Sequence, residues 1–262
     1  MQDSSSLVLI VLVVFTIISI FIVNKYVGKK PIIKDNILSK DIIISILDTI
    51  GFFNVLSEED KHIFYERVDY FLRTTKISAE KGAIITDRDK VLLAASAIIP
   101  LFHFSQWAYE NLTEVIIYPD TFNEKFSTTE ADKNILGMVG DGALNHKMLI
   151  SLHSLRAGFE KNSSGNTAIH EFVHLIDKAD GLVDGVPEYL IPRTLIEPWL
   201  KEMHETIREI KNGESDIRAY ASTNEAEFLA VVSEYFFKKP NLLKKEHPEL
   251  YNLLDKIYTK RA

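Results

Sequence analysis

Two histidines four residues apart, His170 and His174, are the first residues in this chain with an evident chemical use. On a helix, residues i and i+4 lie on one face, so both imidazoles can bind a single metal ion. Glu171 is placed to reach a water on that ion and to act as its general base. The same pattern also fits two ordinary histidines on the surface of an amphipathic helix, because short motifs recur by chance. A third ligand is therefore needed before the pattern predicts a metal site.

The choice of third ligand is narrowed by what the chain lacks. It contains no cysteine, so imidazoles and carboxylates must hold any zinc. A metzincin would carry glycine and histidine where this chain has Asp177 and Asp180, so that class is excluded. A glutamate from a later helix remains. Glu225 would lie in the first helical turn, where an exposed acid suits the helix dipole without any metal. Glu227 would lie deeper, on the face that carries Glu234, so helix geometry favours it modestly.

The elements that position these residues follow from hydrophobic spacing and capping signals. The predicted helices cover residues 41–53, a segment that begins after the N-cap Ser57, and residues 90–104, 166–179, 192–211, 225–238 and 248–260. Two β-rich runs, Thr113–Tyr118 and Lys147–His153, are predicted strands. The strongly apolar segment 90–104 contains Pro100 and is too short and interrupted to span a membrane, so we expect a buried core helix.

Together these elements predict an α+β fold that is mostly α, with a small mixed sheet before the site helix. We expect a zincin-like catalytic domain at residues 37–262, preceded by a juxtamembrane linker at residues 24–36. The formal net charge of −7 makes a general affinity for nucleic acid unfavourable, so no nucleic-acid partner is expected.

The N-terminal segment Leu7–Val23 is apolar and uncharged. As a helix it would be about 25 Å long, which is the short end of a bilayer span. A cleaved signal peptide and a buried core helix are the alternatives. No positive residue precedes the segment and no small-x-small cleavage site follows it, which favours an uncleaved transmembrane anchor. Lys25, Lys29 and Lys30 follow it, so we expect a single-pass protein of the cell membrane with its catalytic domain on the cytoplasmic side.

Two longer stretches carry a resemblance to a known family. HEFVHLIDKADGLVDGVP at residues 170–187 and YASTNEAEFLAVVSEYFF at residues 220–237 resemble the Mlc titration factor A family of zinc peptidases, which are of the gluzincin type. The catalytic domain of anthrax lethal factor is similar in the same paired motifs. The match is strongest over residues 147–240 and weaker over residues 57–122, and the N-terminal anchor lies outside it.

The resemblance implies roles for individual residues. His170, His174 and Glu227 would bind zinc, and Glu171 would be the general base. Tyr220 would stabilise the oxyanion, although the sequence by itself also fits a buried aromatic that caps a helix. Asp177 would accept a hydrogen bond from a ligand imidazole, or else be a surface acid at a helix end.

The resemblance also implies a role for the strand before the site helix and for His153. The strand Lys147–His153 would align an extended peptide through main-chain hydrogen bonds. His153 itself would be a strand or loop residue, because the three ligand positions are already filled. No other substrate-binding residue is identified.

These observations predict a membrane-anchored, zinc-dependent peptidase that attacks a peptide carbonyl with a metal-activated water. Whether it is an aminopeptidase or cuts internally is left open. Its partners would be a peptide or protein substrate and the lipid bilayer, through residues 7–23. The alternative is a membrane-tethered regulatory protein that binds a transcriptional repressor or another partner, with a structural or vestigial metal site. Glu171 favours the peptidase, because degenerate sites commonly lose the general base.

Overall fold

The computed structural model describes residues 32–33, 37–104, 107, 109–123, 128, 135–139, 146–163, 165–188 and 190–259. The chain forms two units, residues 1–32 and 33–262, and every described helix and strand belongs to the second. Among the described residues, no helix combines the length and the apolar composition needed to cross a membrane. The predicted span Leu7–Val23 lies outside the described residues, as does most of the predicted linker.

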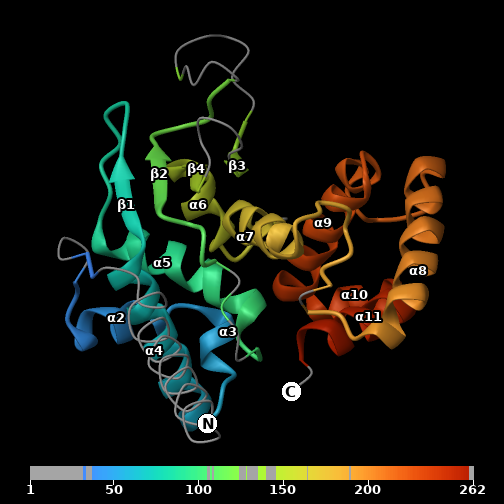
Figure 1. The fold of residues 1–262 in the computed structure, drawn as a ribbon, viewed down its shortest axis with the longest axis horizontal. Helices are drawn as coiled ribbons and strands as arrows, with labels where there is room; N and C mark the ends of the chain where they lie inside the picture. The colour runs from blue at the N-terminus through green and yellow to red at the C-terminus, as the bar shows by residue number, and fades with distance from the viewer. Residues whose placement is uncertain are drawn as a thin grey trace, which may run out of the picture. The chain divides into compact units, whose positions relative to one another are not determined.

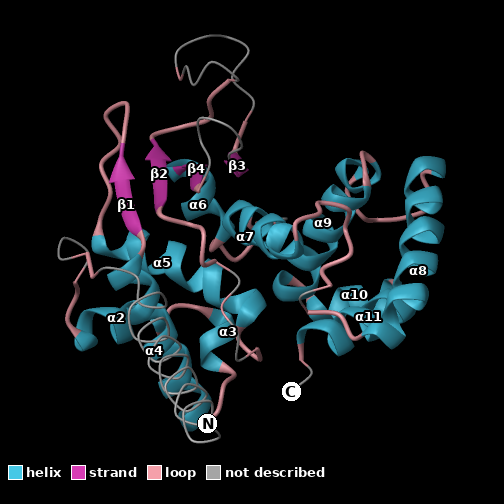
Figure 2. Cartoon of the chain, in the orientation of Figure 1, coloured by secondary structure: helices cyan, strands magenta, loops and turns pink. Residues whose placement is uncertain are grey.

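Helices make up most of the described fold, as Figure 2 shows. They are α2 (Lys40–Leu47), α3 (Gly51–Asn54), α4 (Glu58–Thr74), α5 (Asp87–Ile98), α6 (Leu152–Gly158), α7 (Thr167–Asp177), α8 (Arg193–Asn212), α9 (Glu225–Lys238), α10 (Pro240–Glu246) and α11 (Pro248–Tyr258). Several begin at side-chain caps that satisfy free backbone N–H groups. Ser57 accepts from the backbone of Asp60, and Thr86 forms a reciprocal capping box with Asp89. The expected α+β fold, mostly α, is confirmed.

Four short strands form one mixed sheet in the order β1-β2-β4-β3. They are β1 (Lys76–Ala79), β2 (Glu114–Tyr118), β3 (Gly137–Val139) and β4 (Lys147–Ser151). β1, β2 and β4 are parallel, whereas β3 runs antiparallel to β4 and forms the edge beyond it. The connection from β1 to β2 contains α5, because parallel neighbours need a crossover rather than a tight turn. The small mixed sheet that the sequence predicts before the site helix is therefore confirmed.

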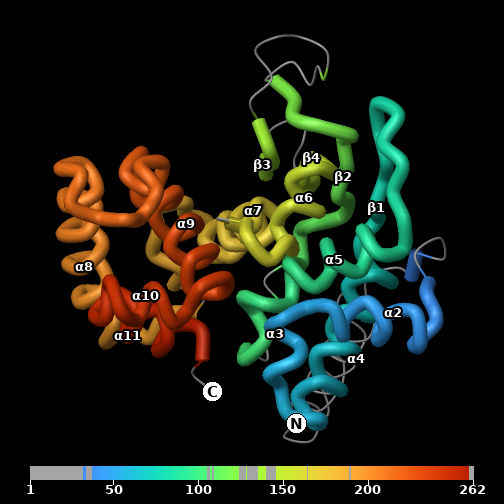
Figure 3. Tube along the Cα trace, turned by 180° about the vertical axis from the view of Figure 1, so that it is seen from behind, coloured from blue at the N-terminus to red at the C-terminus, as the bar shows by residue number. Residues whose placement is uncertain are grey.

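The helix α7 occupies the middle of the fold. Viewed from opposite sides in Figures 1 and 3, it lies between α5, α6 and β3 on one side and α9 on the other, and it packs against all four. Phe172 on α7 is fully buried, and its ring lies 5.6 Å from that of Phe71 and 5.1 Å from that of Tyr109. Burial of such a side chain contributes about 1.5–3 kcal/mol, so α7 is held firmly by its apolar face.

Three predicted boundaries need correction. The segment 41–53 is not one helix but α2 and α3, because the chain turns at Asp48, whose carbonyl accepts a hydrogen bond from the Asn54 amide. The segment 90–104 is a buried helix as expected, but α5 ends at Ile98 and a 3-10 turn that contains Pro100 follows. The strand predicted at 147–153 ends at Ser151, whose hydroxyl caps α6.

Candidate metal centre

The helix α7 presents His170 and His174 side by side. It begins after Asn166, whose side chain accepts the backbone N–H of Ile169 and fixes the first turn. His170 Nε2 and His174 Nε2 are 3.1 Å apart, and the rings meet edge to face with their centroids 4.7 Å apart. Both imidazoles therefore aim at one point, as the i, i+4 spacing predicts.

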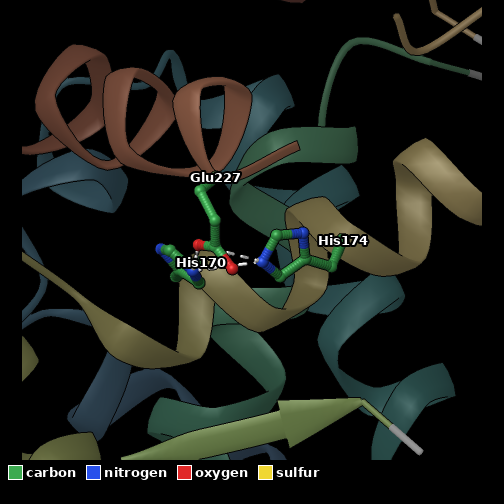
Figure 4. A group of neighbouring side chains, drawn as sticks. All are labelled: His170, His174 and Glu227. Carbon is green, nitrogen blue, oxygen red and sulfur yellow. Dashed lines mark hydrogen bonds and ion pairs between the residues drawn. The ribbon is translucent and has the colours of Figure 1, made fainter. Parts of the chain in front are cut away.

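The helix α9 brings Glu227 to the same point. Asn224 caps this helix by accepting the Glu227 backbone N–H. The Glu227 carboxylate lies 3.0 Å from His170 Nε2 and 3.6 Å from His174 Nε2, and Figure 4 shows it directed between the two rings. Glu225, the other candidate, is half exposed, and its carboxylate lies 3.9 Å from His204 instead. The geometry selects Glu227.

The donor set fits a divalent metal ion. One ligand atom from each of His170, His174 and Glu227 lies within 4.8 Å of the other two. Two ligand atoms of a tetrahedral zinc, each about 2.0–2.1 Å from the metal, stand about 3.3 Å apart, which is within the 3.0–3.6 Å that separates these nitrogens and the Glu227 oxygen. Two imidazoles and one carboxylate leave a fourth position for water or substrate, as in catalytic rather than structural zinc sites.

Charges at the cluster are strongly coupled. Burial works to lower the pKa of His170, but hydrogen bonds with Glu227 and Glu234 outweigh it and raise the pKa to about 10. Burial works to raise the pKa of Glu227, but hydrogen bonds from His170 and His174 hold it well below its usual range. The two carboxylates therefore stabilise a positive charge at His170.

Glu234, one heptad beyond Glu227 on α9, holds His170 from behind. Its Oε1 lies 2.8 Å from His170 Nδ1 and also accepts from Arg218, while its Oε2 accepts the Asn166 backbone N–H at 2.6 Å. Gly165 makes this possible, because a Cβ there would stand 2.2 Å from Glu234 Oε2. A carboxylate on the far nitrogen of a ligand imidazole fixes its tautomer and its orientation.

Glu171 lies beside the cluster with its carboxyl group against β3. The residue is 6% exposed, and burial raises the pKa of its carboxyl group. A Cβ at Gly137 would stand 2.7 Å from both Cγ and Oε1 of Glu171, so any larger residue at this point of β3 would displace the Glu171 side chain. The raised pKa suits a group that must take and then release a proton near neutral pH.

Tyr220 lies on the other side of the cluster, in a 3-10 helix at Ala219–Ser222. Its ring centroid is 6.1 Å from that of His170, and the residue is 54% exposed. The alternative of a buried, helix-capping aromatic is therefore wrong. Burial of the hydroxyl raises its pKa to about 12, and the neighbouring Glu227 adds to this effect. Tyr220 thus keeps its proton and can donate a hydrogen bond into the site.

Asp177 supports the loop after the site helix. It is fully buried, Oδ2 accepts the backbone N–H of Gly185, and Oδ1 has no hydrogen-bond partner among the described residues. The alternative of a surface acid is therefore wrong. The predicted hydrogen bond from a ligand imidazole is not among the hydrogen bonds of the described residues, where Glu234 is the carboxylate on His170 Nδ1. The carbonyl of Gly185 accepts a hydrogen bond from Trp199 Nε1 at 2.7 Å. The turn at Gly185 is therefore hydrogen-bonded to Asp177 at the end of α7 and to Trp199 on α8.

The strand beside the site is β3, not the predicted Lys147–His153. β4 lies between β2 and β3, so its backbone groups are engaged on both sides. Within the described strands, β3 is paired on one side alone. His153 lies on α6, exposed to solvent, and is neither a strand nor a loop residue.

Two cavities meet along β3 at the cluster. A cavity of about 500 Å³ is lined by Gly137–Val139, all three cluster residues, Glu171 and Tyr220. A second, of about 420 Å³, opens beside it on the His170 side and includes Arg218 and Thr167. Room for an extended chain therefore exists on the open side of the metal position.

Sequence reasoning did not assign functions to Gly137, Gly165, Arg218 or Glu234. The heptad spacing from Glu227 to Glu234 was the one available signal, because both must lie on the α9 face that meets α7. The two glycines and Arg218 come from segments that the tertiary fold alone brings to the site.

The fold and the site together define the class of protein: an HExxH helix and a glutamate from a later helix form one candidate metal site. The family model of the glucose-regulated metallo-peptidase M90 matches residues 25–259, and the chain belongs to this family.

Relatives include Mlc titration factor A of Pectobacterium atrosepticum, which is 27% identical over 78% of this chain and 80% of its own length. Mlc titration factor A of Klebsiella pneumoniae is 26% identical over the same shares. The uncharacterized protein slr2042 of Synechocystis is 27% identical over 80% of each chain. The resemblance inferred from the two motifs is confirmed.

Proposed function

We propose that this protein is a zinc-dependent peptidase. The observation that carries the proposal is the convergence of His170, His174 and Glu227 within 4.8 Å of one another, with the buried Glu171 beside them. Membership of a metallopeptidase family supports it. A divalent zinc ion in this site would act as a Lewis acid that polarises the substrate carbonyl and lowers the pKa of water.

The residues of the chain would divide the remaining chemistry. Glu171 takes a proton from the attacking water and passes it to the leaving amine. Tyr220 keeps its proton and donates a hydrogen bond to the developing oxyanion. Glu234 and Arg218 hold the ring of His170, and the free side of β3 offers backbone groups to an extended peptide.

The central experiment replaces Glu171→Gln in the full chain. Zinc content should stay at one ion per chain, because the three proposed ligands are retained. Cleavage of a mixed peptide library should fall by about 100-fold or more, because general acid–base catalysis contributes about 10²–10⁴-fold. Glu209→Gln, on the exposed side of α8, is the matched control and should behave as wild type. Undiminished cleavage by Glu171→Gln would refute the proposed mechanism.

A regulatory role is the second candidate, and it rests on relatives named Mlc titration factor A. In that case the protein binds a transcriptional repressor, and the metal site has a structural role. Two measurements with the Glu171→Gln protein distinguish the candidates. If the protein is a regulator, the variant still binds its partner in a pull-down and still changes transcription. If the protein is a peptidase, the variant no longer cleaves its substrate.

We also propose that residues 7–23 attach the protein to the cell membrane, with residues 33–262 on the cytoplasmic side. The uncharged apolar run and the lysines that follow it support this placement. Carbonate extraction of cell membranes should leave the full chain in the pellet and release a form that begins at Ile33. Recovery of the full chain in the soluble fraction would contradict the placement.

A further inference from the structure

The 420 Å³ cavity on the His170 side of the cluster is lined by Arg218, and we call it the Arg218 pocket. Leu136 and Gly137 line it from the β3 side and Thr167 from the first turn of α7. Its lining includes His170 and Glu171 but not His174 or Glu227. The pocket is therefore placed to receive a substrate group next to the bond under attack.

Arg218 is the most exposed charged residue that lines this pocket. The two carboxylates of the pocket belong to Glu171 and Glu234, which are only 6% and 3% exposed. The carboxylate of Glu234 is already engaged in hydrogen bonds with His170, Asn166 and Arg218. The side chain of Arg218, by contrast, is 44% exposed.

Arg218 has capacity left for a ligand. A guanidinium carries five N–H donors in a planar fork. Within the described residues Arg218 directs one nitrogen, Nη2, to Glu234. The rest of the fork can pair with a second carboxylate in two parallel hydrogen bonds, which is the geometry that arginine favours over lysine. Glu234 fixes the guanidinium in place, so such a ligand would meet a preorganised cation.

Glu171 allows the leaving side of the substrate to occupy the Arg218 pocket. It must hand its proton to the leaving amine, and it lines both this pocket and the larger cavity, whereas His174 and Glu227 line the larger cavity alone. The Arg218 pocket is therefore the cavity in which a cation lies within reach of the residue that supplies this amine. We propose that Arg218 selects substrates with a carboxylate on the first residue after the cleaved bond; this inference rests on the proposed peptidase function. The carboxylate belongs to an aspartate or glutamate side chain, or to the chain terminus.

Binding of mercaptoacetyl compounds to the zinc-loaded full chain tests the selection without any cleavage. The thiol anchors each compound at the metal, and the following residue enters the pocket. The three compounds are the glutamate amide, the glutamine amide and the glutamine free acid. At least one carboxylate compound should bind about tenfold more tightly than the glutamine amide, because its carboxylate can accept charge-assisted hydrogen bonds from the guanidinium. Preference for the first or the last identifies the source of the carboxylate.

Variants assign the preference to Arg218. Arg218→Gln should bring the affinity ratio to about one, whereas Arg208→Gln, which removes the same charge from the exposed side of α8, should leave it unchanged. Arg218→Lys should keep part of the preference. It replaces Arg218→Gln in the test if that variant no longer binds zinc. Equal binding of the three compounds by wild type, or a ratio that survives Arg218→Gln and Arg218→Lys alike, overturns the inference.

Hydrolysis of matched peptides distinguishes the proposed selectivity of Arg218 from the proposed peptidase activity on which it rests. The residue after the cleaved bond is an internal glutamate in the first peptide, an internal glutamine in the second and a glutamine that ends the chain in the third. Cleavage of all three at equal rates would remove the selectivity and leave the peptidase. A carboxylate preference in binding, with no cleavage of any peptide, would remove the peptidase and leave the Arg218 pocket as a binding site.

Discussion

At the residue scale, imidazoles and carboxylates alternate in the candidate site: His170 lies between Glu234 and Glu227, and Glu227 lies between His170 and His174. His170 contacts both carboxylates, and its raised pKa is the direct result. A metal ion at Nε2 would replace the proton that His170 carries in its absence. Glu234 would stay on Nδ1 in either state, so it orients the ring whether or not metal is bound.

This exchange predicts proton release when zinc binds. The pKa of His170 is about 10 without metal, so the ring is protonated at pH 7.5 and must lose one proton to bind zinc through Nε2. Calorimetry in two buffers of different ionisation enthalpy should give about one proton released per ion. Zinc affinity should rise with pH through the neutral range, because the proton on His170 competes with the metal. A binding enthalpy independent of the buffer would contradict the prediction.

Glu234→Gln should weaken zinc binding by about 10–100-fold, because the variant loses the charge that orients and polarises His170. Competition with a chromogenic chelator measures the change. Glu249→Gln, exposed on α11, is the control and should match wild type. Unchanged affinity in Glu234→Gln would mean that helix packing alone orients the ring.

At the element scale, the site depends on contact between α7, α9 and β3. Gly137→Ala tests the contact with β3, because a Cβ would stand 2.7 Å from Glu171 Cγ. We expect the turnover number to fall by about 100-fold through displacement of the base, with zinc content unchanged. In Gly51→Ala the added Cβ meets no atom within 4 Å, so activity should be retained. Full activity of Gly137→Ala would show that β3 can move away without consequence.

Sequence reasoning succeeded where the determining contacts are local. The cap Ser57 marks a helix start within a few residues of the chain, and the i, i+4 histidines follow from helix geometry. β1 and β3 were missed, since strands of four and three residues carry too little periodicity. α6 was missed because Ser151 both ends β4 and caps the helix. Glu234 had one local signal, its heptad spacing from Glu227, whereas the place of Arg218 in its pocket depends on tertiary packing, which no spacing encodes.

At the scale of the whole molecule, Asp177 makes stability depend on pH. Burial raises the pKa of its carboxyl group from 3.8 to about 6, so the folded chain binds this proton more tightly than the unfolded chain. The fold should therefore lose stability as pH rises from about 4 to about 6, by up to about 3 kcal/mol at about 1.4 kcal/mol per pKa unit. Asp177→Asn should flatten this part of the curve for the metal-free protein.

Chemical denaturation of both proteins between pH 4 and pH 7 measures the difference. Glu209→Gln, on the exposed side of α8, controls for the change in net charge. A slope that persists in Asp177→Asn would assign the pH dependence to other groups.

The hydrogen bond from Trp199 to the Gly185 carbonyl gives the molecule an optical reporter. The chain contains two tryptophans, and Trp107 lies far from this turn in the sequence, half-buried with its ring against Tyr70. In a Trp107→Phe protein, all indole emission would come from Trp199, which is fully buried and tied to the loop that leaves the site helix. Its wavelength and quenching would follow metal uptake, ligand binding and unfolding at the junction of α7 and α8 without an attached dye.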